Sequence, residues 1–452
     1  MENNRTEDDF YGQLIVLGYN GSETVPYQQN GQGGGPSSAS SSQMISTRHT
    51  LRRKASPNGV IPSTKHYVVA DPASSASMRD RRHFVSFVKS RTETLIQEYQ
   101  ADNFTDMFQI GRSTDKPIDV TVKDTRCTDA DGEEMPADHR NVPGSKNCGG
   151  ETSLIPPHRD STISRFACRV LVNRTSYPVP RVFAAGFDNH RNICLGEKAP
   201  KWLTESGMDG LTTNGVLLWH PPSWGRLVHG SEAQNSTWCQ WLEVSVRGAI
   251  LTLRSSRSAK TRGHLLASEC NVVRDGSLID LCGVTLLFRT KEGLDNSPTT
   301  KELDERLASM NADRPQCPVG MNTLVIPRQR NAVAVKSATD QPYIYMTCGH
   351  VQGRHGWGEQ PNKLKKCPIC FKDGSIVRMC MGMEPAFYVG KDVTPTHAFN
   401  PCGHIANFET LDYWSKIPFP HEASAFKPVG AACPFCITLL DAKSPIVRII
   451  FP

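Results

Sequence analysis

The last quarter of the chain repeats one arrangement of metal-binding residue types twice, and this pattern constrains the fold more than any other. Four short pairs carry it: Cys348 and His350, Cys367 and Cys370, Cys402 and His404, and Cys433 and Cys436. Each pair is short enough for one loop to direct both side chains at one ion. Because Zn²⁺ takes four Cys or His ligands tetrahedrally, eight ligands predict two closed zinc sites that build structure. The spacing leaves open whether alternate or neighbouring pairs share an ion, and whether Cys317 replaces one of the eight.

The composition predicts a protein of a reducing compartment, which we take to be the cytoplasm. The chain has 15 cysteines among 452 residues, and those outside the four pairs show no disulfide spacing. Its N-terminus lacks the plan of a signal peptide, and no apolar run approaches the roughly 18 residues of a membrane helix, so we expect no membrane insertion. The net charge of +6 is mild, and no dense basic and aromatic face accompanies it. We therefore expect no nucleic-acid binding.

Short alternating apolar stretches dominate the chain up to about residue 295. A first strand is expected within residues 11–20, and about eleven more between 60 and 290 predict a β-sandwich. The Gln/Gly/Ser tract at 26–57 is expected to be disordered, and the acidic stretch at about 123–160 to form an exposed loop. Residues 298–313 predict a linking helix, with Thr300 as its N-cap and Leu303, Leu307 and Met310 as its apolar seam. Residues 315–452 then form the zinc-binding domain.

Three loops of the predicted sandwich carry groups that suit a phosphate ion. Arg112 follows a glycine, and its guanidinium fork matches two phosphate oxygens. Ser164 and Thr213 offer hydroxyl donors just before two later strands. Asn214 offers an amide to the backbone of a bound peptide, and Gly215 permits the tight turn. Each motif alone is common, so only their combination indicates a binding site.

In this order along a sandwich, the loops resemble those of the forkhead-associated (FHA) domain, which binds phosphothreonine peptides. Ala167 stands where that family has a histidine. Taken whole, the chain resembles the Pellino family, through LIVLGYNG, TDMFQIGRST, STISRFACR, AAGFD, GLTTNGVL, DGSLIDLCG, DRPQCPVG, PTHAFNPCGH and AACPFC. The resemblance implies a mostly β fold: a forkhead-associated sandwich with a β appendage at 11–295, then a small two-zinc, RING-like α+β domain.

The resemblance also implies a function. Pellino proteins are ubiquitin–protein ligases whose partners are a ubiquitin-conjugating enzyme, ubiquitin, and phosphorylated Pelle-like kinases of Toll and interleukin-1 receptor signalling. Such a ligase has no catalytic nucleophile of its own. By analogy with RING domains, candidates for docking the conjugating enzyme are these apolar residues: Pro368, Ile369, Pro434, Phe435, Trp357 and Trp414. Ser86 and Ser90 lie where the family is phosphorylated. The alternative is a non-enzymatic phosphothreonine-binding adaptor in which zinc only stabilises the fold.

Overall fold

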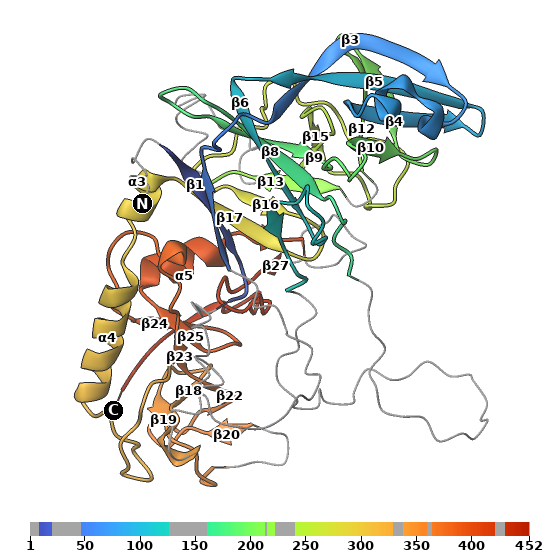
Figure 1. Ribbon diagram of the computed structural model, residues 1–452. Helices are drawn as coiled ribbons and strands as arrows, with labels where there is room; N and C mark the ends of the chain where they lie inside the picture. The colour runs from blue at the N-terminus through green and yellow to red at the C-terminus, as the bar shows by residue number, and fades with distance from the viewer. Residues whose placement is uncertain are drawn as a thin grey trace, which may run out of the picture.

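The computed structural model describes most of the chain as two packed parts (Figure 1). The described residues are 9–19, 47–125, 161–212, 215–221, 240–328, 338–358, 364–420 and 430–451. The predicted loops at 26–57 and 123–160 therefore lie largely outside the described residues. Strands dominate both parts, as predicted, and the predicted fold class is confirmed. Among the described residues, no helix combines the length and the apolar character needed to cross a membrane.

The first part is a sandwich of two sheets. The larger sheet has the order β15 (Ile250–Thr252), β14 (Leu242–Val244), β13 (Val216–Trp219), β16 (Leu278–Asp280), β17 (Thr285–Arg289), β1 (Phe10–Val16) and β2 (Arg48–Arg52). The smaller has the order β7 (Val120–Thr121), β6 (Thr105–Gly111), β8 (Cys168–Asn173) and β9 (Pro180–Ala184). Along β8, Cys168, Val170 and Val172 point into the core, as their alternation predicted.

Strand β2 departs from the sequence prediction, because it falls inside the tract expected to be disordered. Thr50 and Leu51 of β2 pair with Gln13 and Gly12 of β1, so the basic end of that tract becomes an edge strand. Leu51 is buried in the core of the sandwich. An apolar side chain, a free sheet edge and the ion pair of Arg48 with Glu384 thus hold a segment whose composition is polar.

A second four-stranded sheet is appended to the sandwich and extends away from it at the upper right of Figure 1. Its order is β10 (Asn192–Leu195), β4 (His83–Ser90), β5 (Glu93–Asp102) and β3 (Gly59–Val69). The connection from β3 to β4 contains the 3-10 turn η2 (Pro72–Ser74) and the short helix α1 (Ala76–Arg79). A small hairpin, β11 (Lys201–Thr204) and β12 (Gly207–Gly210), follows β10.

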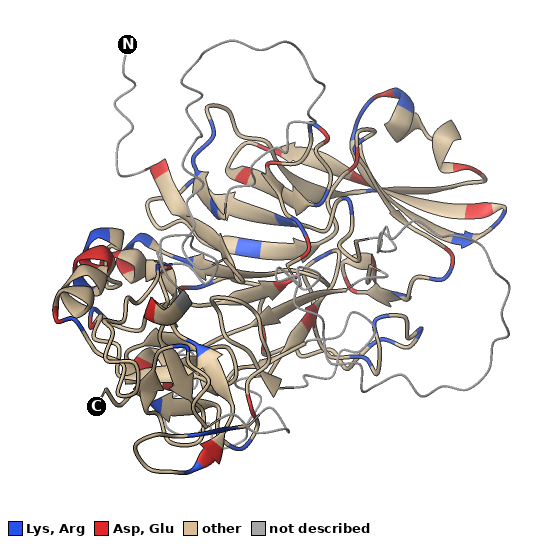
Figure 2. Ribbon diagram, turned by 90° about the horizontal axis from the view of Figure 1, so that it is seen from below, with Lys and Arg blue, Asp and Glu red and all other residues tan. Residues whose placement is uncertain are grey.

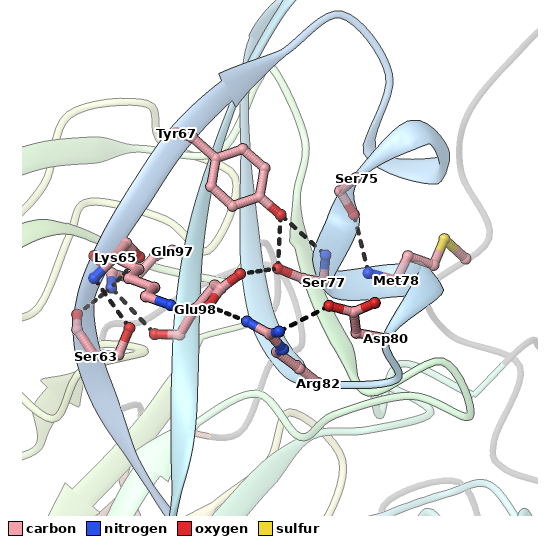
Figure 3. Close-up of polar contacts among 10 residues, drawn as sticks. All are labelled: Ser63, Lys65, Tyr67, Ser75, Ser77, Met78, Asp80, Arg82, Gln97 and Glu98. Carbon is pink, nitrogen blue, oxygen red and sulfur yellow. Dashed lines mark hydrogen bonds and ion pairs between the residues drawn. The ribbon is translucent and has the colours of Figure 1, made fainter.

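A hydrogen-bonded network fixes α1 to the appended sheet (Figure 3). Glu98 of β5 is buried and accepts the hydroxyl of Ser77 at 2.9 Å and the Arg82 guanidinium at 3.2 Å. Tyr67 of β3 lies 2.7 Å from the same Ser77 hydroxyl, and Arg82 also pairs with Asp80 at 2.8 Å. A buried carboxylate is costly unless its oxygens are paired, so these contacts hold helix and sheet together as one unit.

Two helices lead from the sandwich to the second part: α3 (Lys291–Asp295) and α4 (Thr300–Ala312). The N-cap of α4 is Thr299, and the prediction of Thr300 was wrong by one residue. Thr299 accepts the amide of Glu302, and the Glu302 carboxylate accepts the amide of Thr299, which makes a capping box. The predicted seam is present, with Leu303 and Leu307 buried in the core.

The second part consists of short strands around one larger helix, α5 (Phe408–Ser415). One sheet has the order β19 (Val351–Gln352), β18 (Tyr343–Tyr345) and β22 (Ile376–Arg378). Another has the order β23 (Cys380–Met381), β25 (His404–Ala406), β24 (His397–Phe399) and β28 (Ile446–Arg448). Two further ladders join β20 (Lys365–Lys366) to β21 (Asp373–Gly374) and β26 (Pro418–Phe419) to β27 (Gly430–Ala431). The 3-10 turns are η4 (Ala338–Asp340) and η5 (Pro385–Phe387).

The two parts share a hydrophobic core. Side chains from β1, β13 and β17 of the sandwich cluster with side chains from η5 and α5, including Trp219 and Trp414. The Trp241 indole donates to the Pro418 carbonyl at 2.5 Å, and the amide of Gly18 donates to the Pro434 carbonyl at 2.9 Å. The zinc-ligand part is thus packed directly on the sandwich.

Acidic and basic residues are interspersed over the described part of both bodies (Figure 2).

Candidate metal centres and phosphate-binding loops

The first two ligand pairs converge on one point. Cys348, His350, Cys367 and Cys370 each place a ligand atom within 4.8 Å of the others. The His350 Nδ1 lies 3.4 Å from the Cys348 sulfur and 3.5 Å from the Cys367 sulfur. A hydrogen bond from the backbone amide of Lys372 lowers the pKa of the Cys370 thiol. A lowered thiol pKa favours the thiolate, which is the form that binds metal.

The last two pairs form a second cluster of the same composition. Cys402, His404, Cys433 and Cys436 meet the same 4.8 Å criterion, with the Cys433 sulfur 3.7 Å from the His404 Nδ1. Hydrogen bonds from the thiols of Cys402 and Cys433 hold the pKa of Cys436 well below its usual value. Each cluster therefore combines three thiols and one imidazole. In each, the pKa of one thiol is lowered, that of Cys370 in the first and of Cys436 in the second.

This donor set fits zinc. Tetrahedral coordination at about 2.3 Å places the ligand sulfurs about 3.8 Å apart, which matches the compact spacing of both clusters. Three sulfurs and one nitrogen fill the four positions, so no position stays open for a substrate. His404 is buried, and the ring nitrogen that faces the cluster is Nδ1, 3.7 Å from the Cys433 sulfur. The chemistry that such an ion supplies is folding energy.

The pairing left open by the sequence is sequential: the first pair joins the second, and the third joins the fourth. Cys317 belongs to neither cluster found among the described residues. Its thiol is buried, and its sulfur accepts the amide of Gly320 at 3.3 Å. Cys317 therefore does not replace one of the eight predicted ligands in this structure.

The segment Cys317-Pro-Val-Gly320 nevertheless has the backbone of a metal-binding knuckle. In it and in both Cys-Pro-x-Cys segments, the amide four residues after the first cysteine donates to that cysteine's carbonyl at 2.8 to 3.0 Å. The donors Met321, Phe371 and Ile437 all have a positive φ, of 56°, 60° and 58°. Gly320 stands where the other two knuckles have their second cysteine. The described part of the chain thus contains three knuckles, of which two carry a full ligand pair.

The two metal-binding units are copies of each other, joined by exchanged strands. In each unit a strand before the Cys-Gly-His turn pairs with an Ile-Val-Arg strand: β18 with β22, and β24 with β28. The chain then continues from each Ile-Val-Arg strand onto the turn of the other unit. Cys380 donates to the Gly403 carbonyl at 3.2 Å, and Ile450 donates to the Gly349 carbonyl at 2.8 Å. Each unit is completed by a segment of the other: β23 lies on the second Cys-Gly-His turn, and the segment around Ile450 lies on the first.

The six candidates for docking a conjugating enzyme divide by exposure. Phe435 and Trp414 are only 1% exposed, and Pro434 is also buried, because they pack within the shared core and against the sandwich. Their burial removes these three from the surface that a partner can contact in this arrangement. Ile369 (37% exposed) and Trp357 (39% exposed) lie on the surface of the first unit.

Pro368, the sixth candidate, lies beside Ile369 in the knuckle of Cys367 and Cys370 and is half-buried. Phe371 at the tip of that knuckle is 63% exposed. Phe371 was not among the docking candidates predicted from the sequence. Its large apolar side chain directly after a metal-ligand pair was the signal that could have added it to the docking candidates.

The structure brings two of the predicted phosphate-binding residues together. The amide of Arg112 donates to the Ser164 carbonyl at 3.2 Å, and the Arg112 side chain is exposed, with its Nε donating to the Ile163 carbonyl at 2.8 Å. Gly111 permits this approach, because a Cβ there would lie 2.1 Å from the Arg165 carbonyl oxygen. Thr213 and Asn214 lie outside the described residues, although their neighbour Thr212 is described.

A second cation of this site was not among the predicted ligands. Arg165 follows Ser164, is exposed, and forms a 2.7 Å ion pair with Asp115. Hydrogen bonds from Ser113 and Arg165 lower the pKa of Asp115. Ala167, which stands in place of the family's histidine, is buried. The sequence signal for Arg165 was its place directly after Ser164, on the same loop as the predicted hydroxyl.

The two candidate phosphorylation sites differ in access. Ser86 of β4 is fully buried, and its hydroxyl donates to the Asn192 side chain at 3.1 Å. A kinase cannot reach that hydroxyl without opening the appended sheet. Ser90 ends β4 at the turn to β5 and is half-buried, with its hydroxyl accepting the amide of Thr92 at 3.3 Å.

Comparison with known proteins covers both parts of the chain. Residues 2–306 match the family model described as Pellino, FHA domain, and residues 310–452 match Pellino, RING domain. The chain is 45% identical over 445 residues to Protein pellino of Drosophila melanogaster, covering 98% of this chain and 92% of that protein. It is 44% identical over 445 residues to E3 ubiquitin-protein ligase pellino homolog 2 of Homo sapiens, covering 98% and 94%.

A third relative, E3 ubiquitin-protein ligase pellino homolog 3 of Mus musculus, is 43% identical over 447 residues, covering 98% of this chain and 89% of that protein. Sandwich, appended sheet and paired metal-ligand clusters thus occur in a chain that matches these relatives almost from end to end. The chain belongs to the Pellino family.

Proposed function

We propose that this chain is a RING-type ubiquitin–protein ligase that recruits phosphorylated proteins through its sandwich. The observation that carries the proposal is the pair of closed Cys3His clusters within a domain that matches the Pellino RING model. Relatives that match along 98% of the chain bear the name E3 ubiquitin-protein ligase. The metal proposed for both clusters is Zn²⁺, in a structural role.

In this proposal the chain contributes position and not a nucleophile. All eight ligands of the two clusters would be held by metal, so none of these thiols can carry ubiquitin. The reactive thioester belongs to a ubiquitin-conjugating enzyme, and the ligase holds that thioester beside the acceptor lysine. Proximity and orientation of this kind can supply a large part of a barrier reduction. Ubiquitin itself remains a transient partner.

The exposed face of the first metal unit is the proposed docking surface for the conjugating enzyme. Its apolar surface is formed by Ile369, Phe371 and Trp357 around the knuckle of Cys367 and Cys370, with Pro368 at its edge. The second unit offers a comparison within the same molecule. Its knuckle tip, Ile437, is buried where it packs beside Gly18 of the sandwich. The knuckle of the second unit therefore packs on the sandwich of the same chain, whereas the knuckle of the first unit is exposed and can contact another protein.

An ubiquitination assay tests the ligase activity. Purified chain with activating enzyme, conjugating enzymes, ubiquitin and ATP should yield ubiquitin chains. Replacing Cys433 and Cys436 together by Ala should abolish them, because the second cluster loses half its ligands. The Cys194→Ala variant, which alters an exposed thiol outside both clusters, should retain full activity. Undiminished activity in the double variant would refute the assignment.

A second pair of variants tests the docking surface. Ile369→Ala should raise the concentration of conjugating enzyme required for half-maximal activity, while zinc content and thermal stability stay unchanged. Leu203→Ala removes an even more exposed apolar side chain from the appended part and should change neither. Equal activity of both variants at every enzyme concentration would place the docking surface elsewhere.

The proposed recruitment signal is phosphothreonine. Arg112 and Ser164 lie together, and Thr213 and Asn214 follow the described Thr212 in the sequence. Arg112→Ala should weaken binding of a phosphothreonine peptide by about 1.5–3 kcal/mol, the usual worth of a charged hydrogen bond. Arg91→Ala at the distant turn between β4 and β5 is the matched control. Equal phosphopeptide affinity of both variants would show that Arg112 does not bind the phosphate.

The proposed targets are phosphorylated Pelle-like kinases of Toll and interleukin-1 receptor signalling, in the cytoplasm. This part of the proposal rests on the family alone. Ser90 is the better of the two candidate acceptors for phosphorylation by such kinases, because Ser86 is buried. Phosphopeptide mapping of Ser90→Ala and Ser86→Ala variants after kinase treatment tests this. Loss of phosphate in the Ser86 variant alone would reverse the assignment.

The alternative is a non-enzymatic adaptor in which metal only stabilises the second part. It would show phosphopeptide binding with no ubiquitin transfer across a panel of conjugating enzymes. The observation that favours it is the burial of Phe435 and Trp414, which removes part of the surface expected for docking. Retained exposure at Ile369 and Trp357 favours the ligase over the adaptor.

A further inference from the structure

A pocket of about 520 Å³ lies between the phosphate-binding loop and the appended sheet. Ser164, Arg165 and Thr212 line it on the side of the proposed phosphate site. Strand β10 and the residues after it line the other side, through Cys194 and Gly196. A peptide anchored by its phosphate at Ser164 therefore has this pocket as its immediate neighbour.

The wall supplied by the appended sheet is held in place. Strand β10 pairs with β4 in parallel, from Asn192 opposite Phe84 to Leu195 opposite Phe87. The buried hydroxyl of Ser86 donates to the side chain of Asn192, which itself lines the pocket. Because the wall is formed by paired strands and not by a free loop, its side chains can discriminate between ligands.

The pocket contains a carboxylate with spare hydrogen-bonding capacity. The Oδ1 of Asp188 accepts the amides of His190 at 2.8 Å and Asn192 at 2.9 Å, which shapes the turn. Among the described residues, nothing donates a hydrogen bond to its Oδ2. The nearest cation on the opposite rim, Arg165, is already paired with Asp115. A negative charge facing a half-open cavity favours a cationic side chain.

We propose that this pocket receives a Lys or Arg side chain that flanks the phosphothreonine of a bound peptide. The appended sheet then sets the sequence preference, with Asp188 as the specificity-determining residue. The inference rests on the proposed phosphothreonine binding and adds the class of peptide that the site selects. The remaining lining, which includes Phe166 and Ala185, packs along the aliphatic stem of such a side chain.

Binding of synthetic peptides to the full chain tests the proposal. The probes are a phosphothreonine tripeptide with Ala on both sides, and nonapeptides in which each flanking Ala is replaced in turn by Lys. We expect one or more Lys positions on one side of the phosphothreonine to bind about two- to five-fold more tightly than Ala there, the range for a partly exposed ion pair. The tripeptide serves as the reference that carries no cationic side chain for the pocket.

Two variants change the pocket without touching the phosphate loop. Asp188→Asn removes the charge but keeps an oxygen that can accept the same two amides. Gly196→Leu fills the pocket, since a Cβ there meets nothing within 4 Å, and Gly356→Leu is its control at an equally open glycine of the zinc-ligand part. Asp188→Asn and Gly196→Leu should each abolish the preference for Lys and leave tripeptide affinity unchanged.

The outcomes separate this inference from the function on which it rests. If no phosphothreonine peptide binds, phosphate recognition fails and the pocket proposal fails with it. If the tripeptide binds and no Lys position improves affinity, only the pocket proposal is overturned. A Lys preference that survives in both Asp188→Asn and Gly196→Leu also overturns it, because the preference then arises elsewhere.

Discussion

The α-carbon of Gly349 lies so close to the backbone of Arg448 that a Cβ on the glycine would sit 1.8 Å from the Arg448 carbonyl oxygen. Gly403 stands in the same relation to Arg378, with a Cβ 2.1 Å from its carbonyl oxygen. The two glycines have φ values of 77° and 76°. Each is the centre of a Cys-Gly-His turn, and each arginine ends the Ile-Val-Arg strand of the other metal unit. The duplicated units are therefore interlocked at two equivalent points.

Substitution of either glycine should disrupt the interlock. Gly349→Ala and Gly403→Ala should each lower the free energy of unfolding by about 1–3 kcal/mol or more, from the positive φ and the clash with backbone. Gly356→Ala, at a glycine with open space around it, should have little effect. Denaturant unfolding monitored by circular dichroism measures this. Stability of Gly403→Ala equal to that of Gly356→Ala would contradict the interlock.

The exchanged strands predict that the two metal ions are bound cooperatively. Cys370→Ser should reduce the zinc content from two ions per chain to fewer than one, since loss of the first unit withdraws the strand that completes the second. Cys194→Ser should retain two. Native mass spectrometry gives the stoichiometry. A Cys370→Ser protein that keeps one full equivalent would show that the sites are independent.

The packing of the two parts depends on a largely buried ion pair. Arg48 of β2 contacts Glu384 at 2.6 Å, and the Glu384 side chain is 2% exposed. Arg48→Ala should destabilise the chain by about 1–3 kcal/mol, because a buried carboxylate loses two charged hydrogen bonds. Lys416→Ala breaks an exposed pair with Asp412 and should cost less than 1 kcal/mol. Limited proteolysis should cut the Arg48 variant, but not the Lys416 variant, faster than wild type.

Stability should fall as the pH falls from 6.5 towards 4. Burial and the nearby charge of Arg274 lower the pKa of His220 to about 4 in the folded state. The unfolded state, with a pKa near 6.5, then binds the proton first, so acid favours unfolding across this window. Between pH 7 and pH 5, His220 should lower the free energy of unfolding by about 2 kcal/mol. His83, whose pKa burial also lowers to about 4, adds to the same fall.

The measurement for His220 is the free energy of unfolding at pH 7 and pH 5. The His220→Gln variant should lose about 2 kcal/mol less than wild type over this interval. His190→Gln, at an exposed histidine, should lose as much as wild type. Parallel losses in all three proteins would mean that His220 does not titrate as its burial implies.

Much of the architecture followed from local patterns. The alternation of Cys168, Val170 and Val172 placed β8 correctly, because a half-buried strand needs a two-residue period. The eight residues of the two Cys/His clusters could be singled out from the sequence because each pair lies within one loop. The N-cap of α4 was misplaced by one residue, since Thr299 and Thr300 are chemically equal and only the reach to Glu302 selects between them.

What the sequence by itself determined is the set of residues whose chemistry is local: eight candidate metal ligands in four pairs, alternating strands, and Arg112 after a glycine. Only the tertiary structure decided which ligand pairs share an ion and that Phe435 and Trp414 are buried. It also placed β10 as the wall of a pocket beside Ser164. These outcomes depend on contacts between residues far apart in the chain, and neither spacing nor residue type records such contacts.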